Sequence, residues 1–99
     1  MKVNWSETAA AQLEAIYEYI GHASPGYARV LVDKITRKSE QIQMFPLAGR
    51  VVPEIRKKQI REVFESSYRV IYHIRSDGIE VLAVLHGARN LNFSEFDED

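Results

Sequence analysis

The strongest constraint on the fold lies in the second half of the chain, where apolar and polar residues alternate with a period of two. Three runs show this alternation, at 60–65, 68–75 and 79–85, and all are rich in Val, Ile, Tyr and Phe. Only Ser66-Ser67 and Ser76-Asp77-Gly78 separate them, and connections this short join antiparallel neighbours. The sequence therefore predicts a meander of three strands, preceded by a shorter strand at Val51-Val52.

The first half of the chain has a helical period after a short opening strand at residues 2–5. Ser6 is the expected N-cap of a first helix that ends at Gly21 and His22. A second helix is expected to begin at Ser24-Pro25, because proline suits the first helical position, and to stop at Pro46. The expected apolar faces are Ala9, Leu13, Ile16, Tyr17 and Ile20 on the first helix, and Ala28, Leu31, Val32, Ile35 and Ile42 on the second.

This order of elements predicts an α+β fold in which an N-terminal helical hairpin packs on a small, mainly antiparallel β-sheet. A chain of 99 residues forms one domain, here residues 1–99, that buries roughly 60–68% of its unfolded surface. Two sets of side chains alternate along the strand at 68–75. Tyr68, Val70, Tyr72 and Ile74 are expected to face the helices, and Arg69, Ile71, His73 and Arg75 a partly solvated side.

Composition excludes several classes of protein. The chain has no cysteine, which excludes disulfides and thiolate metal sites and fits a reducing cytoplasm. No signal peptide or membrane-spanning run is apparent, so we expect a cytoplasmic location without membrane contact. The net charge is −1, but a short acidic tail at 94–99 holds four of the acids, and the remainder is mildly basic. No cofactor is indicated, and His22, His73 and His86 lack the spacing of metal ligands.

Arginines and histidines are the candidates for chemistry. Guanidinium groups suit phosphate or carboxylate, and Arg69 interrupts an otherwise apolar strand. It is either a binding residue or a structural arginine paired with Glu62 or Glu80. His73 and His86 are candidates to meet on one sheet face, where histidine serves as a general acid or base near neutral pH. The alternative is that His86 packs or donates a hydrogen bond.

Several short motifs, in order, resemble the ParE/RelE superfamily of small bacterial toxins. They are Trp5-Ser6-x-x-Ala9, Leu13-x-x-Ile16-x-x-Tyr19-Ile20, Pro46-x-x-Gly49-Arg50, Arg61-Glu62, Tyr68-Arg69-Val70-Ile71-Tyr72 and His86-Gly87-x-Arg89. The likeness is greatest to the ParE, or plasmid stabilisation, branch. It implies the toxin of a type II toxin-antitoxin system that inhibits DNA gyrase, is not itself an enzyme, causes growth arrest, and forms a hetero-oligomer with a cognate antitoxin. The implied residues for binding the antitoxin or target are Arg50, Arg61, Arg69 and Arg89.

The RelE branch supplies the alternative of a ribosome-dependent mRNA endoribonuclease, with the ribosome and mRNA as partners. That resemblance implies catalytic roles for Arg61, Arg69, His86 and Arg89. The branch uses a C-terminal tyrosine for proton transfer, whereas this chain has only Phe93 and Phe96 beyond Arg89, and phenylalanine has no proton to transfer. This departure favours the ParE branch. A non-toxic relative that only binds an antitoxin is the third possibility.

Overall fold

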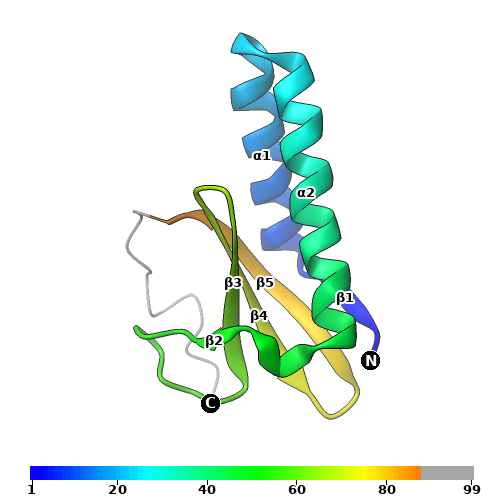
Figure 1. Cartoon of the computed structure of the whole chain (residues 1–99), viewed down its shortest axis with the longest axis vertical. Helices are drawn as coiled ribbons and strands as arrows, with labels where there is room; N and C mark the ends of the chain where they lie inside the picture. The colour runs from blue at the N-terminus through cyan, green and yellow to red at the C-terminus, as the bar shows by residue number, and fades with distance from the viewer. Residues whose placement is uncertain (88–99) are drawn as a thin grey trace.

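The computed structural model describes residues 1–87, which form two helices beside a five-stranded sheet (Figure 1). The sheet order is β1-β5-β4-β3-β2, with β1 parallel to β5 and every other pair antiparallel. This confirms the expected α+β fold. The elements are β1 (Val3–Trp5), α1 (Glu7–Ala23), α2 (Pro25–Met44), the 3-10 helix η1 (Pro46–Ala48), β2 (Arg50–Val51), β3 (Ile60–Glu65), β4 (Tyr68–Arg75) and β5 (Gly78–His86).

The two helices begin in different ways. Ser6 caps α1, because its Oγ accepts a hydrogen bond from the Ala9 N–H at 3.0 Å, and the same hydroxyl donates to the Leu82 carbonyl at 3.2 Å. The α1 N-terminus is thereby attached to β5. Ser24 makes no side-chain cap bond, and Pro25 provides the first position of α2. Neither helix is long and apolar enough to cross a membrane.

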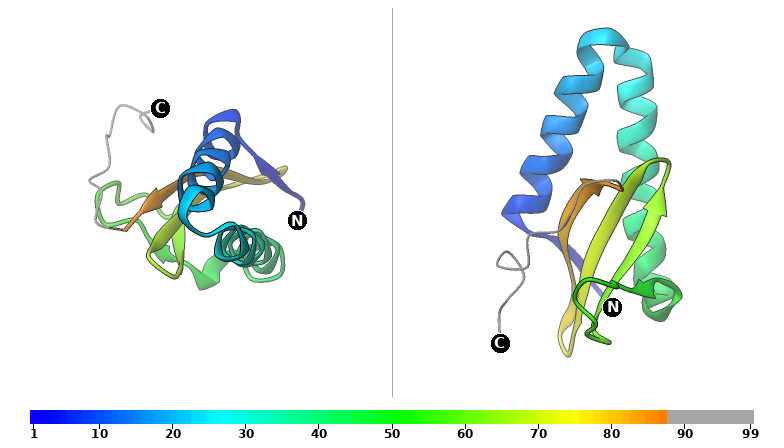
Figure 2. Two further views of the ribbon diagram at one scale, coloured as in Figure 1. Left: turned by 90° about the horizontal axis from the view of Figure 1, so that it is seen from above. Right: turned by 90° about the vertical axis from the view of Figure 1, so that its left-hand side faces the viewer.

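The helical hairpin covers one face of the sheet, and its α1–α2 turn projects beyond the sheet (Figure 2). A single core lies between them, in which Leu31 and Ile35 of α2 meet Val70, Tyr72 and other sheet residues. Tyr68 and Ile74 pack against this core as well, so the expected inner face of β4 is confirmed. Tyr17 was expected in this core, but its side chain is 41% exposed. That expectation was wrong.

The second sheet face is more deeply buried than the sequence suggested. Ile71 and Arg69 are 0% and 4% exposed, so the expectation of a partly solvated face is wrong for both. The chain between β2 and β3 folds back here, and Val52 and Ile55 join Ile71 in a second apolar cluster with Ile60, Ala83 and Leu85. A register shift between Ile71 and Tyr72 changes the pairing with β5 at this point.

Candidate functional site

One edge of the sheet is only partly paired. Strand β2 pairs with Arg61 and Glu62 of β3 and extends no further, so within residues 1–87 no strand pairs with β3 on this side from Val63 to Glu65. The Val52 N–H donates to the Ile60 carbonyl at 3.2 Å, which shows that the Ile60 backbone faces this edge. Because backbone groups alternate along a strand, Phe64 also directs its N–H and C=O outward. Such an edge is a template for another strand.

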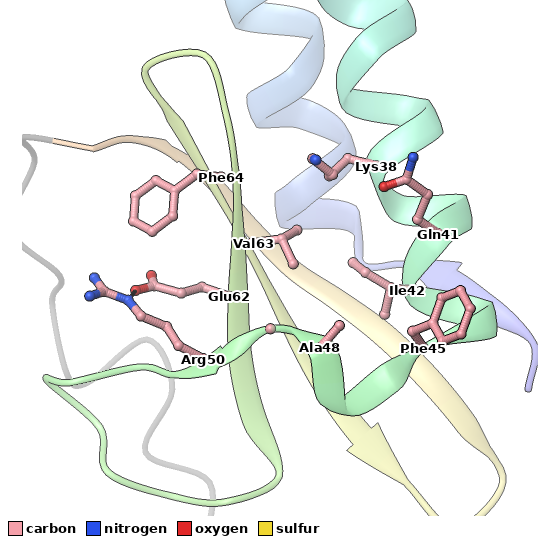
Figure 3. Close-up of a pocket in the computed structure, with 10 residues that line it drawn as sticks. Lys38, Gln41, Ile42, Phe45, Ala48, Arg50, Glu62, Val63 and Phe64 are labelled. Carbon is pink, nitrogen blue, oxygen red and sulfur yellow. Dashed lines mark hydrogen bonds and ion pairs between the residues drawn. The ribbon is translucent and has the colours of Figure 1, made fainter.

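A groove of about 460 Å³ runs beside this edge, between β3 and the C-terminal half of α2. On the helix side of β3, Ile42 and Val63 point toward each other above Ala48 (Figure 3). Phe45, at the end of α2, is 63% exposed and adds an aromatic ring to the wall. Lys38 and Gln41 complete this wall, while Gly49, Arg50, Glu62 and Phe64 line the remainder. The groove is therefore apolar at its centre and cationic at its rim.

Hydrogen bonds with Tyr72 and Arg61 hold the segment 46–49, which joins α2 to β2. The Tyr72 hydroxyl donates to the Pro46 carbonyl at 2.6 Å and accepts from the Gly49 N–H at 3.2 Å. Arg61 donates to the carbonyls of Gly49 at 2.9 Å and Leu47 at 3.3 Å. Burial raises the pKa of Tyr72, so its hydroxyl keeps the proton that it donates. A Cβ at Gly49 would lie 2.7 Å from the Glu62 carbonyl oxygen, which explains why glycine occupies this position.

Four charged side chains form a chain of ion pairs on the other side of β3. The Glu62 carboxylate is fully buried and binds Arg50 Nε through Oε2 and Arg69 Nε through Oε1, both at 2.6 Å. Arg69 also binds both carboxylate oxygens of Glu54, at 2.8 and 2.9 Å. Such planar pairing is strong and directional. The Arg69 guanidinium holds the pKa of Glu54 below its ordinary value, and the two carboxylates raise the pKa of Arg69.

Arg50 is positioned by this network at the groove. Its guanidinium carbon lies 5.2 Å from the centroid of the Phe64 ring, within range of a cation–π contact. The Arg50 side chain nevertheless remains 58% exposed. It is thus a cation held in a defined place beside the open edge of β3, accessible to an acidic group.

Comparison with known proteins shows the family and the fold. A family model described as the ParE toxin of type II toxin-antitoxin system, parDE, matches residues 3–91. The chain belongs to the ParE toxin family. A solved structure titled "Chromosomal ParDE TA system from P. aeruginosa" has a TM-score of 0.73 and 21% sequence identity, covering 87% of this chain and 95% of that chain. At this identity the likeness shows the fold. No curated protein matches the sequence.

Of the arginines implied by the resemblance, Arg50 and Arg69 meet at the Glu62 carboxylate of this ParE-family chain. Arg50 lies at the groove, whereas Arg61 is turned toward the carbonyls of Leu47 and Gly49. Arg69 is buried against two carboxylates, which confirms the structural alternative of a pair with Glu62. Glu80, the alternative partner considered for Arg69, pairs with Arg75. Arg89 lies outside the described residues, as does the acidic tail at 94–99.

The two strand histidines lie on opposite faces of the sheet, so their expected convergence is wrong. His86 pairs in register with Tyr68 on the helix side, and the two rings meet edge to face with centroids 5.6 Å apart. Burial raises the pKa of this Tyr68 phenol. His73 lies two residues after Ile71 and shares its face. Within residues 1–87, no group of His, Asp and Glu is placed to hold a metal ion.

Sequence reasoning missed the groove and two of the residues that shape its surroundings. Glu54 follows Pro53 in an irregular segment, and nothing in its local sequence indicates a pair with Arg69. Gly49 was noted only as part of a motif. Its position immediately before a two-residue strand is the signal for a close backbone approach, which glycine permits.

Proposed function

We propose that this ParE-family protein is the toxin of a type II toxin-antitoxin system, that it inhibits DNA gyrase in the cytoplasm, and that a cognate antitoxin neutralises it in a hetero-oligomer. The groove at the open edge of β3 is the observation that carries the antitoxin part of the proposal. The membership in the ParE toxin family supports gyrase inhibition.

The groove fits an extended antitoxin segment that adds a strand to β3. A strand projects its side chains alternately to two sides. On the helix side, such a segment meets Ile42, Phe45 and Val63, and on the other side it meets Arg50 and the Phe64 ring. A segment with alternating apolar and acidic residues would therefore satisfy both sides.

The binding part is tested by truncating one wall residue and comparing it with a neighbour. Phe45 lines the groove, whereas Met44 is 73% exposed beside it and does not. Phe45→Ala is expected to weaken antitoxin binding about fivefold or more, because loss of an interface anchor costs about 1 kcal/mol or more. Met44→Ala should leave the affinity nearly unchanged. Equal effects of the two substitutions would place the antitoxin elsewhere.

The projecting end of the helical hairpin is our proposed contact with gyrase, together with the C-terminal segment. Tyr19 is 81% exposed, and Tyr27 and Val30 are 54% and 50% exposed. Exposed aromatic residues are enriched where proteins meet. We expect Tyr19→Ala to weaken gyrase inhibition while antitoxin affinity stays unchanged.

A supercoiling assay with purified gyrase tests the proposed activity. The protein should inhibit supercoiling or trap cleaved DNA, and an excess of antitoxin should restore activity. No effect on gyrase at high excess would overturn the proposal. Lack of growth arrest when the chain is expressed alone would favour a non-toxic, antitoxin-binding relative.

The geometry gives less support to the ribosome-dependent endoribonuclease. That mechanism needs cations presented to an RNA phosphate, whereas the Arg69 guanidinium is occupied by Glu54 and Glu62 and Arg61 donates to backbone carbonyls. His86 is exposed at the end of β5. Loss of toxicity in His86→Ala with intact antitoxin binding would favour the nuclease instead.

A further inference from the structure

Positive charge is concentrated in one short stretch of the chain. Residues 50–61 carry five Lys and Arg and one acid, a net charge of +4. Residues 1–49 carry five of each sign, and residues 62–87 carry two cations and four acids. Within residues 1–87, the excess cations therefore all belong to the segment that joins β2 to β3 and to its flanks.

The centre of this segment is Arg56-Lys57-Lys58, here termed the basic loop. All three residues and the following Gln59 are exposed. None of the three takes part in an ion pair within the part of the chain that the structure describes. The nearby Glu54 carboxylate is already bound to Arg69 through both oxygens. Within residues 1–87, no carboxylate therefore neutralises the charge of the loop.

Apolar packing and backbone hydrogen bonds hold the basic loop against the sheet. Ile55 packs against the apolar cluster on the second sheet face, and the N–H groups of Ile55 and Arg56 both donate to the Val52 carbonyl, at 3.1 and 2.8 Å. The Ile60 N–H donates to the Lys57 carbonyl at 3.0 Å. The three exposed cations thus belong to a loop whose backbone is hydrogen-bonded within the protein.

Arg56 adopts a backbone conformation that arginine disfavours. Its φ is 59°, in the left-handed region where glycine or asparagine is usual. Strained residues of this kind cluster at functional positions. Since glycine would relieve the strain, the presence of arginine indicates a use for its side chain.

The chemistry of the basic loop suits a phosphodiester backbone better than a protein surface. Residues 56–59 are Arg-Lys-Lys-Gln and offer no apolar anchor. Protein interfaces are depleted in Lys and rely on such anchors, and on this molecule the groove provides them. Contacts to DNA phosphates come mainly from Arg and Lys and need no apolar residue. We propose that the basic loop binds the backbone of duplex DNA.

This inference rests on the proposed function, because gyrase supplies the DNA. The protein as a whole has a net charge of −1, and three cations alone give weak, salt-dependent binding. A toxin attached to gyrase by another surface holds the loop close to the enzyme's DNA, and this raises its effective concentration. The basic loop lies at the opposite end of the molecule from the α1–α2 turn (Figure 1). One toxin can therefore contact protein and DNA at the same time.

The test compares two double variants with equal charge change. Lys57→Glu/Lys58→Glu alters the loop, whereas Lys34→Glu/Arg37→Glu alters exposed positions on α2 away from the projecting end of the hairpin. Binding of a labelled random-sequence duplex by the purified protein is followed by fluorescence anisotropy over a range of salt concentrations. For the parent, we expect log affinity to fall with log salt at a slope of about −3, roughly −0.9 for each of three phosphates.

The loop variant should lose at least tenfold in duplex affinity and most of this slope, while the α2 variant loses much less. The loop variant should also need a higher concentration than the α2 variant to inhibit gyrase. Equal duplex affinity of the two variants would overturn the inference, as would a loop variant that loses antitoxin affinity in place of duplex affinity. Failure of the proposed function looks different, because the parent itself would then leave gyrase unaffected.

Discussion

The buried carboxylate of Glu62 is the feature whose removal should destabilise the protein most clearly. Its side chain is 0% exposed and lies between the Nε atoms of Arg50 and Arg69. Glu62→Ala would leave the Arg69 guanidinium, itself only 5% exposed, with Glu54 as its remaining carboxylate. A buried cation that loses one of its two carboxylates is costly to keep next to an apolar cluster.

The expected loss can be estimated from the burial of each partner. Removing one partner of a buried ion pair costs about 3–5 kcal/mol, and we expect about 3 kcal/mol here, because Arg69 keeps both bonds to Glu54. Arg50 is 58% exposed, so its pair with Glu62 adds no more than about 0.5 kcal/mol. Domains of this kind are stable by roughly 5–15 kcal/mol in total.

Urea unfolding followed by the fluorescence of Trp5, the one tryptophan, measures this loss. The control is Glu80→Ala, because the Arg75–Glu80 pair has the same charges at 2.9 Å but side chains 42% and 34% exposed. We expect the control to lose no more than about 0.5 kcal/mol. If Glu62→Ala costs no more than Glu80→Ala, the buried network does not stabilise the fold as argued.

Three further substitutions test other parts of the structure. Glu54 has a folded-state pKa below its ordinary value of 4.5, so its charge stabilises the fold above pH 4.5 and this effect is lost as the pH falls through the folded-state pKa. The difference in unfolding free energy between the parent and Glu54→Gln should therefore shrink in acid. A difference that stays constant with pH would contradict this. Gly49→Ala would place a Cβ 2.7 Å from the Glu62 carbonyl oxygen, and this overpacking should lower the free energy of unfolding by about 1–3 kcal/mol and weaken antitoxin binding. Unchanged stability in urea would count against the close packing. Ser66 has a φ of 54° in the β3–β4 turn, so Ser66→Gly should stabilise by about 0.5–1 kcal/mol, and a lower melting temperature would show that the serine is not strained.

Strand positions were predictable because local pattern and turn length specify them. The bounds Ile60–Glu65 and Tyr68–Arg75 match the sequence prediction, since Ser66-Ser67 leaves room for a two-residue hairpin turn alone. The serine cap of α1 followed from local chemistry in the same way. By contrast, Tyr17 lies at the margin of the apolar stripe of α1, where periodicity does not decide between core and solvent.

The second sheet face was not predictable, because a distant segment covers it. Alternation along β4 places Arg69 and Ile71 together, but the burial of that face depends on the path of the chain from Val52 to Ile60. Glu54 belongs to the same distant segment, so the local sequence did not indicate it as a partner of Arg69. The groove likewise depends on the short length of β2 and on how α2 packs beside β3. No local sequence pattern specifies either feature.

Gyrase as the cellular target is the central claim, and pulse labelling of cells within minutes of inducing this chain alone tests it most directly. We predict that thymidine incorporation falls first while methionine incorporation continues. An initial collapse of methionine incorporation would contradict the claim and point to the ribosome as the target.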